Sequence, residues 1–279
     1  MNPIRLRRAL HTAVIAIATL LAATPGAQAT SLVPPASGPC SLENTTRATI
    51  TEVDANLDIT LADGRVLTLA GLDPPRDTPD NPRLAADARE KIAAWLEGRE
   101  VAVRALADKP NRFGRIQARL FAAPPGAPAE EIGIAEAILD AGLARYRPDA
   151  AAHPCRDLLL AAESAARDAK IGLWADPAYA ILPASERAAF AAPRTGMVLV
   201  EGTPISLGET AARFYLNFGP SRGADFAITL SKRGANALEK ASIKVQDLVG
   251  RRLRVRGLID TTFGPQIELS DPDGLELID

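Results

Sequence analysis

This 279-residue sequence has few cysteine and histidine side chains that could serve as nucleophiles, general bases or zinc ligands. The chain has two cysteines, Cys40 and Cys155, and two histidines, His11 and His153. Two cysteines are too few for a four-cysteine zinc site, and a Ser-His-Asp site would have to use His153. That residue precedes Pro154 in a loop, so we expect it to be exposed rather than catalytic. The sequence also lacks a glycine-rich dinucleotide motif and a phosphate-binding P-loop.

The first 29 residues have the pattern of a secretory signal. Arg5, Arg7 and Arg8 precede an apolar stretch, and Ala27–Ala29 has the small-x-small pattern of a cleavage site. The alternative is an uncleaved membrane anchor, which the shortness of the apolar stretch disfavours. We therefore expect an exported protein, periplasmic or secreted, with no stable membrane insertion after cleavage.

Export would place Cys40 and Cys155 in an oxidising compartment, where a pair of cysteines tends to bridge. We expect an intramolecular disulfide between them. Two unrelated thiols, or a bridge between chains, are the alternatives. Within one chain the bridge would close a loop on the order of 100 residues, which is worth up to about 4–5 kcal/mol on the chain-entropy model.

Composition narrows the possible classes of protein. A net charge of −2 argues against a generally basic nucleic-acid coat or a binder of anionic membranes, although a local basic patch remains possible. An apolar content of 47% is sufficient for real cores, and the length suggests two domains.

Residues 46–176, which follow an N-terminal segment at 30–45, predict the first domain. Alternating apolar residues and a turn at Asp63-Gly64 indicate a hairpin. The predicted strands are 48–53, 57–61, 65–72, 101–106 and 115–121, and the predicted helices are 84–97, 132–143 and 157–168. Five strands with a helix between the third and fourth give the order of an OB barrel.

Residues 177–194 are rich in alanine and proline and read as a linker or a short helix between domains. Residues 195–279 predict strands at 198–201, 212–218, 225–230, 253–259 and 266–269, with a helix at 234–241. The expected fold class is therefore β-rich α+β: an OB-fold barrel with helices, followed by a second small OB-like β-barrel.

Four segments of the first domain carry a family resemblance. They are Leu69–Asp73 with Pro75, Arg112–Arg115, Ala141–Arg145, and Ala161–Ala165 with Gly172–Trp174 downstream. In order and spacing the domain resembles the staphylococcal nuclease (thermonuclease) family. The resemblance implies a calcium ion held by two aspartates and a backbone carbonyl, a glutamate that acts as general base, and two arginines. Such groups would stabilise the charge that develops on a phosphodiester under attack by water.

Position by position, little of that set is kept. Asp73 and Arg115 match an aspartate and an arginine, whereas Thr68 replaces the other arginine and Arg76 replaces the glutamate. The second calcium aspartate falls on Asn56 when the alignment is anchored from the left, and on Leu57 when it is anchored from the Asp63-Gly64 turn. We expect a catalytically degenerate nuclease domain with no cofactor.

Two alternatives stay open. Asp73 and Arg115 serve equally well as a turn-capping carboxylate and a surface cation. Conversely, a one-residue change of register would bring Asp54, Asp58 or Asp63 inward, because successive side chains of a strand face opposite sides. The protein would then be an active Ca²⁺-dependent DNA and RNA endonuclease with relocated ligands.

The second domain offers possible contacts to single-stranded nucleic acid or another polyanion. Arg213, Tyr215 and Asn217 share one strand face, and Arg252, Arg254 and Arg256 form a basic stripe on another strand. The alternative is that these arginines pair across strands with acids such as Asp260 and Glu268. An envelope protein-interaction module is the remaining possibility, and it would present an exposed apolar patch.

Overall fold

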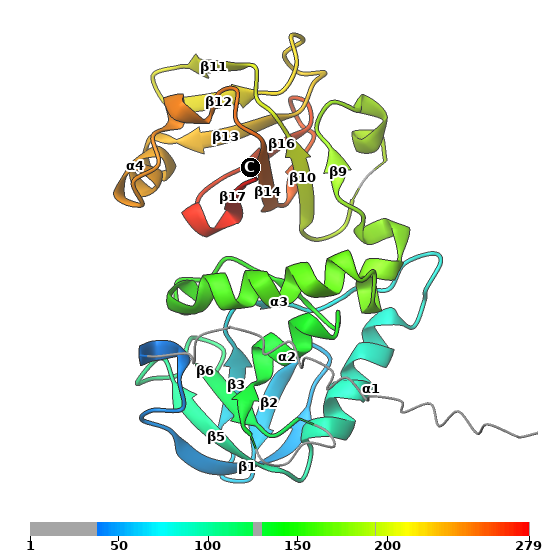
Figure 1. The fold of residues 1–279 in the computed structure, drawn as a ribbon, viewed down its shortest axis with the longest axis vertical. Helices are drawn as coiled ribbons and strands as arrows, with labels where there is room; N and C mark the ends of the chain where they lie inside the picture. The colour runs from blue at the N-terminus through cyan, green and yellow to red at the C-terminus, as the bar shows by residue number, and fades with distance from the viewer. Residues whose placement is uncertain (1–37, 125–129, 193, 279) are drawn as a thin grey trace, which may run out of the picture. The chain divides into compact units, whose positions relative to one another are not determined.

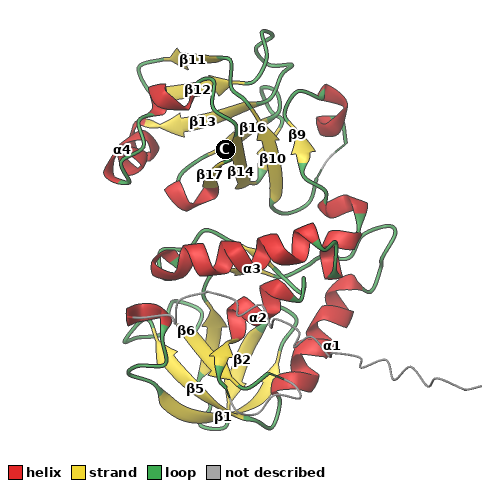
Figure 2. Cartoon of the chain, in the orientation of Figure 1, coloured by secondary structure: helices red, strands yellow, loops and turns green. Residues whose placement is uncertain are grey.

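The computed structural model describes residues 38–124, 130–192 and 194–278, and residues 36–279 cluster as one compact unit. The predicted signal sequence and the start of the N-terminal segment lie outside the described residues. Within the described part, no helix combines the length and apolar character needed to cross a membrane. Figure 1 follows the chain from the N-terminal to the C-terminal end, and Figure 2 separates its helices from its strands.

The first domain is built on a six-stranded sheet in the order β3-β2-β1-β5-β6-β7. A parallel pairing of β3 with β6 closes the sheet into a barrel, as the OB-like order predicted. The strands are β1 (Thr46–Val53), β2 (Asp58–Leu61), β3 (Val66–Leu69), β5 (Glu100–Ala105), β6 (Arg115–Ala122) and β7 (Ile132–Gly133).

Alternation of side chains fills this barrel. Ile59, Leu61, Leu67 and Leu69 point inward and are almost fully buried. Gly64 turns the β2–β3 hairpin at a φ of +85°, in the left-handed region that glycine adopts without strain. The predicted turn is therefore confirmed.

Three helices and a short two-stranded sheet complete the first domain. The helices are α1 (Leu84–Leu96), α2 (Ile134–Asp140) and α3 (Arg156–Asp168), and Figure 1 shows α1 and α2 against the strands of the barrel. Ile92 and Leu96 of α1 join the barrel core, as the apolar stripe of that helix predicted. Strand β4 (Leu72–Asp73) pairs antiparallel with β8 (Arg145–Tyr146), which places Asp73 directly beside Arg145.

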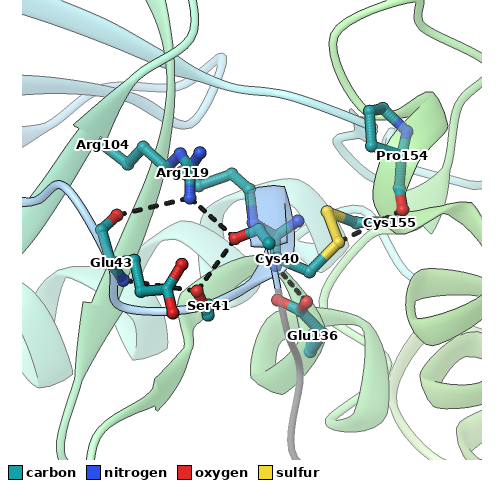
Figure 3. Close-up of a disulfide and its surroundings, with 9 residues drawn as sticks. Cys40, Ser41, Glu43, Arg104, Arg119, Glu136, Pro154 and Cys155 are labelled. Carbon is teal, nitrogen blue, oxygen red and sulfur yellow. Dashed lines mark hydrogen bonds and ion pairs between the residues drawn. A yellow bond between two sulfur atoms is a disulfide. The ribbon is translucent and has the colours of Figure 1, made fainter.

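A disulfide joins Cys40 to Cys155, as predicted, across a Cα–Cα distance of 5.6 Å. Both cysteines are buried. Figure 3 shows the bridge beside Arg104, which donates hydrogen bonds to the carbonyls of Gly38 and Glu43. The bridge therefore attaches the segment before β1 to the turn that precedes α3.

The C-terminal domain has two sheets that share continuing strands. A four-stranded sheet has the order β17-β14-β10-β9, and a five-stranded sheet has the order β11-β12-β13-β16-β15. The strands are β9 (Leu182–Pro183), β10 (Val198–Gly202), β11 (Ser206–Glu209), β12 (Arg213–Asn217), β13 (Ala227–Ser231), β14 (Leu253–Gly257), β15 (Ile259–Asp260), β16 (Gln266–Glu268) and β17 (Leu275–Leu277), with α4 (Lys232–Lys240) after β13. The chain passes from the first sheet to the second between β10 and β11 and again between β14 and β15, and the OB-like character of this domain stays a prediction.

The structure departs from the prediction at residues 177–194. Strand β9 pairs in parallel with β10, and Phe190 stacks on Phe226 with 5.2 Å between ring centroids. Leu182, Ala184 and Phe190 belong to the C-terminal core. Much of the predicted linker is therefore part of the second domain, because its few apolar residues are spaced to fill that core rather than to form a strand or helix pattern.

The disulfide should contribute strongly to stability. We expect the Cys40→Ser/Cys155→Ser variant to lose up to about 4–5 kcal/mol of unfolding free energy, because the loop of the unfolded chain is no longer closed. Urea unfolding of the wild type with and without reductant measures the same loss without a substitution. Two free thiols in the oxidised wild type, detected by mass spectrometry, would contradict the predicted bridge.

Candidate functional site

Asp73 lies at the end of β4, where a nuclease-like site would hold its metal. Its carboxylate is buried and is engaged by two arginines. Arg145, its neighbour across β8, donates to Oδ2 at 2.7 Å, and Arg76 approaches the two oxygens at 3.4 and 3.5 Å. Asp73 is thus neither a turn cap nor a free ligand, because a guanidinium on each side supplies its counter-charge.

Tyr179 covers the same corner. Its hydroxyl accepts a hydrogen bond from the backbone N–H of Arg76 at 2.6 Å and lies 3.0 Å from the Arg76 carbonyl, to which it donates. Its ring lies 4.7 Å from the Arg145 guanidinium, within the range of a cation–π contact. The position at which the resemblance expects a general base is therefore fixed by a residue from the chain that leads into the second domain.

Asp58 is the carboxylate that the sequence placed ambiguously. It lies at the start of β2 opposite Thr68, whose hydroxyl donates to Oδ1 at 2.5 Å. Arg115 pairs with Oδ2 at 2.6 Å. Of the three aspartates near the hairpin, Asp58 is thus the one that contacts Thr68, a substituted family position, and Arg115, a retained one.

Asp54 and Leu57 explain this placement of Asp58. The Asp54 carboxylate accepts from the backbone N–H groups of Asn56 and Asp58, which tightens the turn before β2. Leu57 takes a left-handed φ of 62° and buries its side chain in the barrel core. Leu57 therefore gives the site no ligand, and the acidic residue that follows it faces the arginine instead.

The donor set does not fit a calcium ion. Such sites use six to eight oxygens, including several carboxylates. Here both candidate carboxylates already bind arginine, and the glutamate position carries Arg76. Throughout the described residues, no cluster of three or more acidic, histidine or cysteine side chains could hold a metal ion.

Comparison with protein families identifies the fold of the first domain. Residues 66–176 match the family model described as staphylococcal nuclease homologue. The chain contains a staphylococcal-nuclease-like domain. No curated protein matches the chain. The match covers the part of the chain from β3 to the end of the helical segment after α3, and the C-terminal domain lies outside it.

The basic stripe of the C-terminal domain is engaged by carboxylates. Arg252 and Arg254 both bind Glu201 on the neighbouring β10, and Arg254 also binds Glu276 on β17 at 3.0 Å. The partners differ from the acids named in the sequence analysis, Asp260 and Glu268, because β14 pairs with β10 and β17. The stripe is therefore not available as an open surface for a polyanion.

Arg256 is the clearest correction, because its side chain is fully buried. It donates two hydrogen bonds to Glu163 of α3, at 3.1 and 2.8 Å, and one to the Tyr146 carbonyl at 2.8 Å. It also pairs with Glu276 at 2.5 Å. Burial alone would raise the pKa of Glu276, but Arg256 and Arg254 outweigh it and hold that pKa below its ordinary value. Arg256 thus joins the C-terminal domain to the nuclease-like domain.

His153 also lies at this junction. Its Nδ1 is 2.8 Å from the carboxylate of Asp273, and Arg156 approaches the same carboxylate at 3.4 Å. The imidazole is largely exposed, as predicted, but it is not isolated from the rest of the fold.

A large cleft of 1310 Å³ lies over the five-stranded sheet. Arg213, Tyr215 and Asn217 of β12 line it together, as their shared strand face predicted, and Arg213 also pairs with Glu268 at 3.3 Å. Arg76 and Arg147 of the nuclease-like domain line the same cleft.

The cleft has no excess of positive charge. Its lining includes five arginines and six carboxylates, so it lacks the broad positive field that favours a nucleic-acid strand. Two exposed cations, Arg147 and Arg222, have no carboxylate within ion-pairing distance in the described chain. Two apolar side chains, Leu258 and Phe263, are 68% and 82% exposed at its wall.

Sequence reasoning missed several residues that shape the site. Arg145 and Tyr179 bind the Asp73 corner, although Arg145 stood in a motif and Tyr179 in a supposed linker. The signal for Arg145 was available, since an arginine opposite a buried aspartate in a short antiparallel pair is an expected partner. No local pattern pointed to Tyr179, because its contact with Arg76 spans 103 residues.

Asp58 should make stability depend on pH. Burial raises its pKa, and the Thr68 hydrogen bond and Arg115 offset this only in part. When the pKa of a carboxyl is raised in the folded state, its contribution to the stability of the protein is lost as the pH rises from about 4 through that folded-state pKa. We expect the stability of wild type relative to Asp58→Asn to fall with rising pH, in urea unfolding measured from pH 4 to 7.

Asp63 provides a control of opposite sign. Its pKa is lowered by hydrogen bonds from Arg65, so its contribution is present above about pH 4 and is lost on acidification. The stability of wild type relative to Asp63→Asn should therefore rise with pH. Parallel pH profiles for the two variants would contradict the burial of Asp58.

The Arg256–Glu163 pair gives a second prediction. Arg256→Ala should cost about 3–5 kcal/mol of unfolding free energy, because it leaves the Glu163 carboxylate buried without its main partner. Arg252→Ala, directly before β14, is the matched control, because loss of its exposed pair with Glu201 should cost about 1 kcal/mol or less. Equal losses in chemical denaturation would show that Arg256 is not buried in an ion pair.

Proposed function

We propose that this is an exported protein whose nuclease-like domain does not hydrolyse phosphodiesters and binds single-stranded nucleic acid or another polyanion only weakly. The observation that carries the proposal is the pairing of Asp73 with Arg145 and Arg76. In the mechanism that the resemblance implies, hydrolysis uses a divalent cation and a carboxylate that activates water. At this corner the cation position is served by guanidinium groups, which have no open coordination site for water.

The alternative of a relocated calcium site finds little support in the side chains. Asp58 does face the site, as a change of register would require, but Arg115 and Thr68 already engage its two oxygens. A metal ion would have to displace Arg115 and would then meet Arg76 at the position of the missing glutamate. Positive charge beside a metal site disfavours the cation.

Export is supported by two independent features. The chain starts with a signal-like pattern, and Cys40 and Cys155 form a disulfide in the folded domain. Disulfides persist in oxidising compartments such as the periplasm.

Weak binding follows from the balance of charges. Many of the exposed arginines already pair with acids, so only a few cations are left for phosphates. One exposed group suits a single strand: Phe113 is 64% exposed, with the Arg112 guanidinium 4.7 Å from its ring centroid. An aromatic ring beside a cation can stack a base and contact its phosphate.

A protein-binding role is the second candidate. Leu258 and Phe263 are both exposed and both line the large cleft, which places apolar surface where such a role would need it. This surface lies on the C-terminal domain, away from Phe113 in the sequence, so the two roles can be tested separately.

The test uses the chain from residue 30 onward and a labelled single-stranded oligonucleotide. Anisotropy and strand length are recorded together at low salt, with calcium or with chelator. We expect the strand to stay intact and its anisotropy to rise when the protein is added, and to fall again with added salt. Phe113→Ala should weaken the affinity about fivefold or more, if one stacked base is lost. Leu258→Ala is the matched apolar control.

Two outcomes would overturn parts of the proposal. Calcium-dependent shortening that disappears in Arg115→Ala would show a working, relocated nuclease site. An intact strand that never binds would remove nucleic acid as the ligand and favour a protein partner.

A further inference from the structure

A second, smaller pocket of 360 Å³ lies beside the Asp73 corner. Its volume is within the range of about 300–1,000 Å³ typical of small-molecule sites. It is lined by the corner residues Arg76, Arg145 and Tyr179 and by Arg194 and Thr195, which lead into the C-terminal domain. The pocket therefore stands where the resemblance would place catalytic groups, but with different side chains.

The charge of this pocket is positive. Three of its lining residues, Arg76, Arg145 and Arg194, are arginines, and Asp77 is the one acid among them. Asp77 accepts a hydrogen bond from the backbone N–H of Ala85, which occupies one of its oxygens. Asp73 lies behind the arginines and neutralises only part of their charge.

Two of the arginines have buried donors without a partner. The Nε of Arg145 and the Nε of Arg194 are both buried and make no hydrogen bond within the described protein. The Arg145 side chain as a whole is only 4% exposed. Leaving a buried charged donor unsatisfied costs on the order of 1–3 kcal/mol or more, so these two arginines keep hydrogen-bonding capacity that the described protein does not use.

Gly196 leaves room for the guanidinium of the third arginine, Arg76. It has a φ of +79°, and a Cβ built on it would lie 2.3 Å from an Nη atom of Arg76. The absence of a side chain thus lets the Arg76 guanidinium lie flat against the backbone at the mouth of the pocket. Since Arg76 also lines the large cleft, a ligand held here could extend into that cleft.

We propose that this pocket binds a phosphate group, as inorganic phosphate or as the terminal phosphate of a larger molecule. Three guanidinium groups offer the charge and the fork-shaped donors that match a phosphate. One of the three, Arg76, stands at the position where the resemblance expects the glutamate, so the charge at that position is reversed. This inference goes beyond the proposed weak binding of a strand and can fail separately from it.

The experiment measures phosphate binding by the chain from residue 30 onward in a phosphate-free buffer. Isothermal titration and thermal unfolding are run with inorganic phosphate, against sodium chloride of equal ionic strength. The wild type should bind with a melting temperature that rises with phosphate concentration. Arg194→Gln and Arg76→Gln should each weaken binding tenfold or more.

Two further variants test the assignment. Arg145→Lys keeps a cation beside Asp73 but removes the unpartnered Nε, so it should also weaken binding. Arg187→Gln is the matched control, because this exposed arginine pairs with Asp225 and does not line the pocket. Urea unfolding of every variant confirms that a loss of binding is not a loss of folding.

A dinucleotide with and without a 5′-phosphate identifies the source of the group. Tighter binding of the phosphorylated form than of inorganic phosphate supports a strand end or nucleotide, and equal binding supports the free ion. The proposal would be overturned if the folded wild type bound neither inorganic phosphate nor the phosphorylated dinucleotide. It would also be overturned if Arg194→Gln, Arg76→Gln and Arg145→Lys all left the binding unchanged. Each of these results is independent of whether the oligonucleotide in the earlier experiment is cut.

Discussion

The buried pair between Arg256 and Glu163 joins the two domains of this protein. Its guanidinium and carboxylate meet through two parallel hydrogen bonds, and Glu163 also accepts from the backbone N–H of Tyr146. Removing both charges from water is expensive, and their attraction compensates only where the geometry is good and further hydrogen bonds satisfy most of the remaining donors and acceptors. Here Glu276 and the Tyr146 carbonyl supply the remaining acceptors for Arg256, although its Nε stays without a partner. The pair therefore fixes which face of β14 meets α3, because any other contact would leave both charges buried and unmatched.

The same chemistry recurs around Asp73 and Asp58 of the nuclease-like domain. Asp73 and Asp58 stay buried because Arg145 and Arg115 neutralise them. A guanidinium satisfies a carboxylate as a metal ion does, but it has no vacant site at which to polarise water or a phosphodiester. The changes at Leu57, Thr68 and Arg76 are therefore one electrostatic change rather than three independent losses. Once arginine provides the counter-charge of the aspartate, adding a metal ion would leave excess positive charge, and adding a second carboxylate would leave excess negative charge.

The sequence predicted what depends on local pattern. Period-two alternation located most of the longer strands, and the Asp63-Gly64 pair located the hairpin turn between β2 and β3. Strands β9, β11 and β17 of the C-terminal domain were not predicted. The residues of β12 that face the cleft followed from the same alternation. Partner choice could not be predicted in this way. Arg256 has the same alternation as Arg252, yet one is buried against a helix 93 residues earlier and the other is exposed.

The segment that joins the two domains shows again that contacts between distant residues cannot be read from a local pattern. Residues 177–194 have neither helical nor strand periodicity, and composition alone indicated a linker. In the structure Tyr179 binds the backbone of Arg76, while Leu182 and Phe190 fill the C-terminal core. One short segment thus contacts both the altered corner and the second barrel. Arg76 is therefore held through its backbone as well as through its side chain. Through Tyr179, the segment that attaches the C-terminal domain thus also fixes the backbone at Arg76, the position at which the resemblance expects a glutamate.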